Sequence, residues 1–316
     1  MARRKRETGW PPAPEPLPSP VVDDHTHLES VVGWRADGWD PADAVARPGL
    51  AEHPDLAAHL ARAAQVGVTR MVQVGCDLEA VAWTDAVVRE HPALLGAVAI
   101  HPNEAVLHAG VREVAPDGLD PDPQPRHDVP LDDALAAVAA VARDNPRVRA
   151  IGETGLDFFR AGERGRAVQR EAFRAHVALA KELGLALQIH DRDAHDEVVD
   201  VLRRDGAPER TVFHCFSGGP DLAQVCAEEG WYCSFAGPVS FPANGDLRAA
   251  LRLLPASLVL VETDAPYLTV HPFRGRPNAP YLLPGTVRTV AETTGRAVED
   301  VCAQVSAVSA QVYGEW

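Results

Sequence analysis

The chain lacks the long apolar segments that mark membrane proteins. No apolar run approaches the roughly 18 residues that a membrane helix needs. The basic residues at positions 3–6 are followed by a proline-rich stretch and not by an apolar one, which excludes an ordinary signal peptide. We expect residues 1–19 to be a disordered or extended proline-rich lead-in outside the fold. Its basic cluster could contact nucleic acid, but a solvated tail fits better. We expect a cytoplasmic protein, on the cysteine pattern described next.

Paired cysteines and an excess of positive charge are also missing. The five cysteines are widely spaced and none forms a C-x-x-C motif. Reduced, mostly buried thiols fit this pattern best. The net charge of −15 argues against a broad phosphate-binding surface, although bound cations and a few arginines can reverse the sign at a local site.

Short β-type runs alternate with amphipathic, alanine-rich helical runs over residues 20–316. Eight strands are expected, at Val21–Asp24, Arg70–Val74, Leu95–Ile100, Val148–Glu153, Ala186–His190, Thr211–His214, Trp231–Phe235 and Leu258–Glu262. Helical patterns separate these strands, and two more close the chain, around Pro284–Thr294 and Val298–Tyr313. The alternation predicts a single α/β domain with the TIM-type (β/α)8 barrel fold. An open doubly wound sheet is the alternative, but the first strand lacks the glycine-rich turn that such a sheet would have.

Two connections are much longer than the others, residues 29–54 and 101–130. Both follow a strand and precede a helix, so in a barrel they lie on the face where active sites form. Both are rich in aspartate, proline and glycine. This composition is equally compatible with disordered loops that have no role at the site and with a lid that restricts the substrate.

Histidines and carboxylates stand at the end of six of the eight expected strands. His25 and His27 are one residue apart, so on a strand they share one face. The other positions are His101, Glu153, His190, His214 and Asp264. Any one of them alone is compatible with a structural role, but in a barrel all of these side chains converge on one point.

Four histidines and two carboxylates are too many ligands for one tetrahedral ion and fit two divalent ions. We expect His25, His27 and Asp264 at one ion and His190 and His214 at the other, with Glu153 bridging them. Lysine occurs only at Lys5 and Lys181, in the lead-in and in a helix. A carboxylated lysine therefore cannot form the bridge. The ligand types fit Zn²⁺, Mn²⁺ or Mg²⁺ without selecting among them.

Such a centre predicts hydrolysis by an activated water. Asp264 and Glu153 are the expected catalytic residues, with Asp264 placed to take the proton of the water. The bond hydrolysed is an ester, an amide or a phosphodiester, and ligand geometry does not decide among them.

In these motifs and their order, the chain resembles the TatD family of metal-dependent hydrolases, within the amidohydrolase superfamily. The matching stretches are Asp23-Asp24-His25-Thr26-His27-Leu28, Ile100-His101-Pro102, Ile151-Gly152-Glu153-Thr154-Gly155-Leu156-Asp157, Ile189-His190-Asp191-Arg192, His214-Cys215-Phe216-Ser217-Gly218 and Glu262-Thr263-Asp264-Ala265-Pro266-Tyr267-Leu268. The resemblance implies a TIM-type barrel, two divalent metals held by the same six ligands, and a deoxyribonuclease, often a 3′–5′ exonuclease on single strands.

Several positions depart from the family pattern without touching a ligand. Phe158 and Phe159 stand where two tyrosines are common, and Ala279 replaces a glutamate. These changes, like the acidic loops, bear on the substrate. Aspartates near the mouth would repel a long duplex, so DNA ends or a short phosphoester are easier to accommodate.

The expected substrate contacts are His101, Arg192, Tyr267 and Arg276. Arg192 could clamp a phosphate or pair with Asp193 or Glu197. Arg276 could bind phosphate or be idle. Tyr267, like Phe158 and Phe159, could stack on a base or pack in the wall.

Three functions remain open from the sequence. The first is a metal-dependent phosphodiesterase, and the second is an esterase or amidase such as a D-aminoacyl-tRNA deacylase. The third, a non-catalytic scaffold, would be supported by the loss of a ligand, and none is lost. Nothing in the sequence indicates a membrane or an obligate protein partner.

Overall fold

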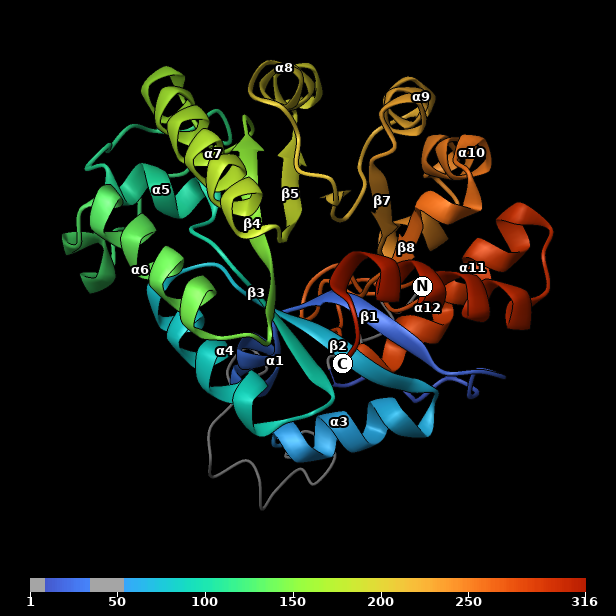
Figure 1. Ribbon diagram of the computed structural model, residues 1–316. Helices are drawn as coiled ribbons and strands as arrows, with labels where there is room; N and C mark the ends of the chain where they lie inside the picture. The colour runs from blue at the N-terminus through green and yellow to red at the C-terminus, as the bar shows by residue number, and fades with distance from the viewer. Residues whose placement is uncertain (1–8, 35–53) are drawn as a thin grey trace, which may run out of the picture.

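Eight parallel strands form the centre of the structure, a computed structural model that describes residues 9–34 and 54–316 (Figure 1). Within these residues each strand pairs with the next along the chain, so sheet order and chain order agree. The strands are β1 Val21–Thr26, β2 Val68–Gly75, β3 Leu94–Val98, β4 Val148–Asp157, β5 Ala186–Arg192, β6 Thr211–Phe213, β7 Tyr232–Phe235 and β8 Val259–Val261. The predicted barrel is confirmed.

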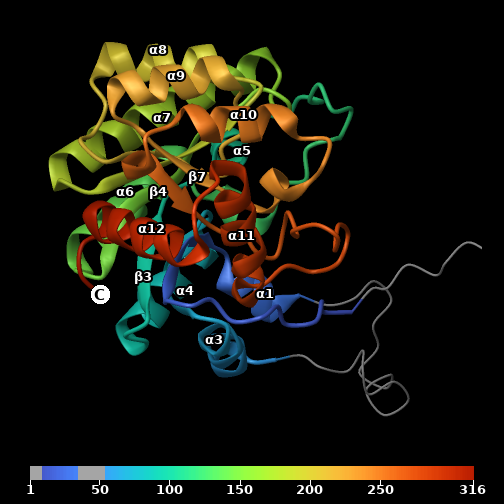
Figure 2. The same cartoon turned by 90° about the vertical axis from the view of Figure 1, so that its right-hand side faces the viewer.

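Helices surround the strands, as the two perpendicular views show (Figures 1 and 2). They are α1 Leu28–Gly33, α3 Leu56–Gln65, α4 Leu78–Glu90, α5 Pro102–His108, α6 Leu131–Asp144, α7 Glu163–Leu183, α8 His195–Asp205, α9 Pro220–Glu229, α10 Gly245–Leu253, α11 Leu283–Thr294 and α12 Val298–Tyr313. In the described part of the chain, no helix is both long and apolar enough to cross a membrane.

The barrel closes between its first and last strands through the segment after β8. The Asp23 carboxylate accepts hydrogen bonds from the backbone N–H and the hydroxyl of Thr263, at 2.8 and 2.6 Å. The backbone N–H of Asp264 donates to the carbonyl of His25 at 3.0 Å. This seam fixes the β1 histidines against Asp264.

The opposite end of the barrel is filled by apolar side chains and by α12. Val72, Leu95 and Leu260 are fully buried in one cluster with Val312 and Tyr313 of that helix. The hydroxyl of Tyr313 accepts a hydrogen bond from the Gln188 side chain at 2.7 Å. One end of the barrel is thus closed by packing, and the carboxyl ends of the strands remain for a site.

The prediction of a disordered lead-in over residues 1–19 is wrong for residues 9–19, while residues 1–8 lie outside the described part. Leu17 is buried and its N–H donates to the Val66 carbonyl at 3.0 Å. The Tyr281 hydroxyl donates to the Pro11 carbonyl at 2.6 Å. Proline-rich backbone without internal hydrogen bonds can still be held by donors from the rest of the fold. We call residues 9–19 the N-terminal strap.

The second long connection contains regular structure, with α5 at residues 102–108 and a 3₁₀ turn at Pro125–Asp128. Glu104 of α5 accepts hydrogen bonds from Arg126 at 2.7 Å and from His127 at 2.8 Å. These contacts hold the turn against the helix, so this connection is not a disordered loop. Of the first connection, residues 35–53 lie outside the described part of the chain.

Candidate metal centre

The carboxyl ends of five strands bring the six predicted ligands into one cluster. β1 supplies His25 at its end and His27 just after it, and β8 is followed by Asp264. Glu153, His190 and His214 come from β4, from β5 and from the residue after β6. Five of the six, His25 excepted, line a cavity of about 750 Å³, within the range of ligand pockets.

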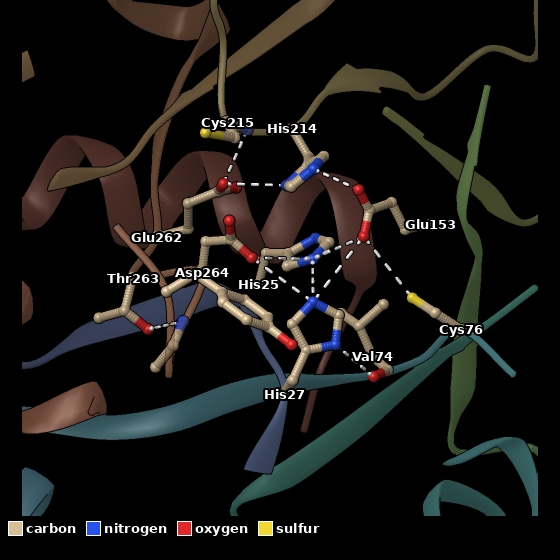
Figure 3. Close-up of polar contacts among 12 residues, drawn as sticks. His25, His27, Val74, Cys76, Glu153, His214, Cys215, Glu262, Thr263 and Asp264 are labelled. Atoms are coloured by element: carbon tan, nitrogen blue, oxygen red, sulfur yellow. Dashed lines mark hydrogen bonds and ion pairs between the residues drawn. The ribbon is translucent and has the colours of Figure 1, made fainter. Parts of the chain in front are cut away.

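The first group of donor atoms contains both β1 histidines and Asp264 (Figure 3). The Nε2 atoms of His25 and His27 lie 3.3 Å apart. Oδ1 of Asp264 lies 3.4 Å from His27 Nε2 and 3.9 Å from His25 Nε2. Oε2 of Glu153 lies 3.7 and 3.8 Å from the same two nitrogens.

The second group is arranged around the other oxygen of Glu153. Its Oε1 lies 2.5 Å from Nδ1 of His190 and 2.8 Å from Nε2 of His214. The two oxygens of one carboxylate therefore face two different sets of nitrogens. A carboxylate that bridges two ions needs this arrangement.

Hydrogen bonds at Nδ1 leave Nε2 of two histidines facing the acidic side chains of the cluster. The Val74 carbonyl can only accept, so the 3.0 Å contact places a proton on Nδ1 of His27. The Glu262 carboxylate accepts from Nδ1 of His214 in the same way at 3.1 Å. Nε2 of each ring faces carboxylate oxygens and becomes a metal ligand when a cation displaces its proton. The donor set, imidazole and carboxylate, fits a divalent ion.

The opposite charges in the cluster also set the pKa values of Glu153 and His190. Burial alone would raise the pKa of Glu153, but positive charge on His214, His101 and His190 outweighs it and holds that pKa well below the usual range. Burial likewise opposes the charged form of His190, yet the Glu153 charge and the hydrogen bond to Asp157 raise its pKa to about 9. The Glu153 carboxylate is therefore ionised and attracts positive charge.

Local backbone geometry explains why these residues can converge. Gly155 has a φ of +143°, and a Cβ there would lie 2.0 Å from the His190 carbonyl oxygen. Only glycine lets β4 and β5 pair this closely beside the cluster. Asp264 has a φ of +53°, a region that aspartate tolerates better than most residues.

Several residues that hold or flank the ligands are not among those predicted from the sequence. Glu262, fully buried, contacts His214 and accepts the N–H of Cys215 at 2.7 Å. Asp157 lies 3.2 Å from Nε2 of His190, and Cys76 lies 3.6 Å from Glu153. A signal was present, because Glu262 precedes Asp264 by two residues and Cys76 directly follows a strand.

Three of the four predicted substrate residues line the cavity, namely His101, Arg192 and Tyr267. His101 is the N-cap of α5, where its Nδ1 accepts the N–H of Asn103 at 3.1 Å. Arg192 lies over the Phe159 ring at 4.0 Å and, contrary to one alternative, Glu197 is paired with Arg170. Tyr267 is 57% exposed. Phe158 is buried under Arg166 and packs in the wall.

Arg276 does not reach the cavity, which corrects its predicted role in phosphate binding. Its guanidinium donates to the carbonyls of Gly9 and Trp10, at 2.8 and 2.5 Å. Nε and Nη2 of this side chain thus bind the N-terminal strap. Arg160 lines the cavity instead, with Asp117 at 3.6 Å.

Comparison with known proteins agrees with this geometry. The family model described as TatD related DNase matches residues 22–314. The uncharacterized metal-dependent hydrolase TatD of Mycobacterium tuberculosis is 39% identical over 298 residues, which covers 93% of this chain and 98% of that protein. The 3′-5′ ssDNA/RNA exonuclease TatD of Erwinia tasmaniensis is 30% identical and covers 78% of this chain and 88% of its own length.

Among solved structures, the TatD homologue YjjV of Escherichia coli superposes with a TM-score of 0.73. It is 23% identical, and the match covers 93% of this chain and 97% of that chain. At this identity the likeness shows the fold. The family match and the relatives carry the assignment: the chain belongs to the TatD family of metal-dependent hydrolases.

Proposed function

We propose that the chain binds two divalent ions and hydrolyses phosphodiester bonds at the 3′ ends of single-stranded DNA. The observation that carries the proposal is the placement of Glu153, whose two oxygens face separate groups of histidine nitrogens. The proposed ligands of one ion are His25, His27 and Asp264, and those of the other are His190 and His214. Glu153 bridges the two.

Divalent ions held by these residues would supply Lewis acidity for activating water at neutral pH and polarising a phosphoryl oxygen. Asp264 is the proposed general base, because its Oδ1 lies among the donors of the first group and its side chain lines the cavity. Asp157 and Glu262 keep His190 and His214 oriented through hydrogen bonds to their remaining ring nitrogens.

The names of several relatives and the residues that line the cavity support a single-stranded nucleic-acid end as the substrate. Several relatives carry the name 3′-5′ ssDNA/RNA exonuclease. Arg160 and Arg192 can contact phosphates, and the exposed Tyr267 ring can stack on a base. The cavity lining also includes Glu29, Asp77 and Glu104. A strand end with few phosphates suits this mixed charge better than a long duplex does.

The same acidic lining favours the alternative substrate class, an ester or amide whose acyl part carries a positive charge. An aminoacyl ester has an ammonium group beside the scissile bond, as in a D-aminoacyl-tRNA. The carboxylates at the mouth would attract that group. Both readings keep the same metal ligands and differ in the bond that is cleaved. A cytoplasmic location for either reaction stays a prediction.

The deciding experiment is a time course on a 3′-labelled single-stranded oligonucleotide, run in parallel with a D-aminoacyl-tRNA. The protein is first treated with a chelator and then given Mg²⁺, Mn²⁺ or Zn²⁺ separately. We expect stepwise loss of 3′ nucleotides that depends on the added ion. Deacylation without nucleotide release, in protein that binds metal, would replace the nuclease by the esterase.

A further inference from the structure

Cys76 lies beside the proposed metal ligands although no thiol belongs to the predicted set. It directly follows β2, between the strand that carries the paired histidines and the strand that carries Glu153. Its Sγ lies 3.6 Å from Oε2 of Glu153 and points toward the cluster (Figure 3). His27, Cys76 and Glu153 each offer one donor atom, and these three atoms lie within 4.8 Å of one another.

The backbone holds Cys76 rigidly in this place. Its carbonyl accepts the N–H of His101 at 2.9 Å. The next residue, Asp77, is the N-cap of α4 and accepts the N–H of Ala80 at 2.8 Å. At Gly75, on the other side, a Cβ would lie 2.6 Å from the carbonyl oxygen of Ala80, so strand and helix approach closely. The sulfur is positioned by the fold and not by a mobile loop.

The spacing of the donor atoms fits coordination to a common ion. With Zn–S near 2.3 Å and Zn–O near 2.0 Å, an angle of about 110° between the two bonds, which four- and five-coordinate sites both contain, places sulfur and oxygen about 3.5 Å apart. In the structure the Cys76 thiol donates a hydrogen bond to Oε2 of Glu153 across 3.6 Å, close to that separation. The same reasoning gives about 3.4 Å between two imidazole nitrogens, and His25 and His27 are 3.3 Å apart.

We propose that Cys76 is a further ligand of the ion that His27 and Glu153 hold. On coordination the thiol proton is released to solvent and the sulfur binds as a thiolate. Thiolate is a soft donor that favours Zn²⁺ and related transition metals over Mg²⁺. The ion held by the first group of donor atoms would therefore be a transition metal in preference to Mg²⁺. This inference rests on the proposed metal centre but is independent of the substrate.

Cobalt(II) is the probe, because thiolate bound to cobalt adds a charge-transfer absorption in the near ultraviolet, whereas imidazole and carboxylate ligands give only the weaker visible bands. The full-length, chelator-treated protein is titrated with Co²⁺, and bound cobalt is quantified. We expect the near-ultraviolet band in the wild type and its loss in Cys76→Ser, with the visible bands retained. The affinity for Co²⁺ should fall by at least as much as the loss of an outer-shell partner costs, about 10–100-fold.

Cys215→Ser is the matched control. Cys215 also lines the cavity and follows the ligand His214, but its sulfur points away from Glu153 (Figure 3). We expect this variant to keep the near-ultraviolet band. A band that persists in Cys76→Ser, or a wild type that binds cobalt without the band, would overturn the proposal. Failure to bind cobalt at all would overturn the proposed metal centre as well, and with it the proposed hydrolysis. Loss or persistence of the near-ultraviolet band tests only the role of Cys76.

Discussion

At the scale of single residues, Glu153 is the carboxylate that contacts both groups of histidine nitrogens in the site. It is 5% exposed, and its oxygens face nitrogens of His25, His27, His190 and His214. No other described carboxylate contacts both groups of nitrogens. Removing its charge should therefore disturb both proposed ions, whereas loss of a single histidine should disturb one.

We expect Glu153→Gln to lose hydrolytic activity by roughly 10³-fold or more, since residues that act as one catalytic unit are costly to remove. The bound metal should fall below the wild-type content, because an amide bridges two cations poorly. Turnover and metal content measured on the same preparation test this expectation. Glu171→Gln on the exposed surface of α7 is the control and should match the wild type. Full activity in Glu153→Gln would remove the two-metal proposal.

The sequence could predict the convergence of these residues because barrel geometry fixes where strand ends meet. His25 and His27 share a face by strand periodicity, and the remaining predicted ligands lie in the carboxyl-terminal halves of other strands or just after them. It could not predict the role of Arg276. The carbonyl of Trp10 that binds this guanidinium lies 266 residues away in the chain, and no local pattern encodes such a contact.

At the scale of elements, the N-terminal strap is ordered although its proline-rich composition predicts disorder. Its prolines indicate disorder, yet Trp10 packs against Trp34 and His59 with ring centroids 5.1 Å apart in both cases. Leu17 is 7% exposed and belongs to the main apolar core. The strap also receives donors from Arg276, Tyr281 and Arg288. It is therefore expected to contribute to the stability of the barrel.

We expect Leu17→Ala to lower the free energy of unfolding by about 2–5 kcal/mol, as for other buried leucines truncated to alanine. Urea-induced unfolding measures this change. Glu15→Ala in the same strap is the control, because the Glu15 side chain is exposed and only its carbonyl oxygen accepts a hydrogen bond. Equal stability of the two variants would mean that the strap does not take part in cooperative folding.

The connection between β3 and α6 depends on Glu104 for its conformation. Arg126 and His127 both bind this side chain, which is 19% exposed. Burial acts to raise the pKa of Glu104, but the hydrogen bonds from Arg126 and His127 outweigh it and hold the pKa below its usual value. A carboxyl group with a lowered pKa stabilises the folded state above its unfolded pKa and loses that contribution as the pH falls through the folded one.

We therefore expect Glu104→Gln to lower the free energy of unfolding by about 1–3 kcal/mol at neutral pH. The difference from the wild type should shrink as the pH is lowered below the usual glutamate pKa. Thermal unfolding of both proteins across acidic and neutral pH tests the prediction. Glu79→Gln is matched, because Glu79 lies 3.5 Å from the same Arg126 but is 74% exposed. A difference that does not depend on pH would contradict the electrostatic explanation.

Element boundaries were predicted well where periodicity is strong and less well beside the site. The helix α12 has the expected limits and α11 begins one residue before its expected start, whereas β4 continues past Glu153 to Asp157. The extension passes through a shift in register between Ile151 and Thr154, which strand patterns do not reveal. The short helices α1 and α5 were missed, since each has fewer than eight residues.

At the scale of the whole molecule, charge limits how much nucleic acid can be bound. The chain carries 45 acidic and 30 basic residues. Among the described residues that line the cavity, the arginines are Arg160 and Arg192. A nuclease built in this way would contact few phosphates through side chains and rely on its ions for the scissile one.

This small number of contacts predicts a weak salt dependence of binding. Two phosphate contacts on a single strand give a slope of log K against log salt near −1.4. The measurement is the affinity for an oligonucleotide with a hydrolysis-resistant 3′ linkage, taken at several salt concentrations and constant metal.

We expect Arg192→Met to reduce the magnitude of the slope by about 0.7, the contribution of one contact. Arg252→Met changes the net charge equally, and Arg252 is exposed and lies outside the residues that line the cavity, so the slope should not change. A wild-type slope steeper than about −3.5 would imply five or more phosphate contacts. Binding would then extend over a surface well beyond the cavity, and the acidic mouth could not be what restricts the substrate to a strand end.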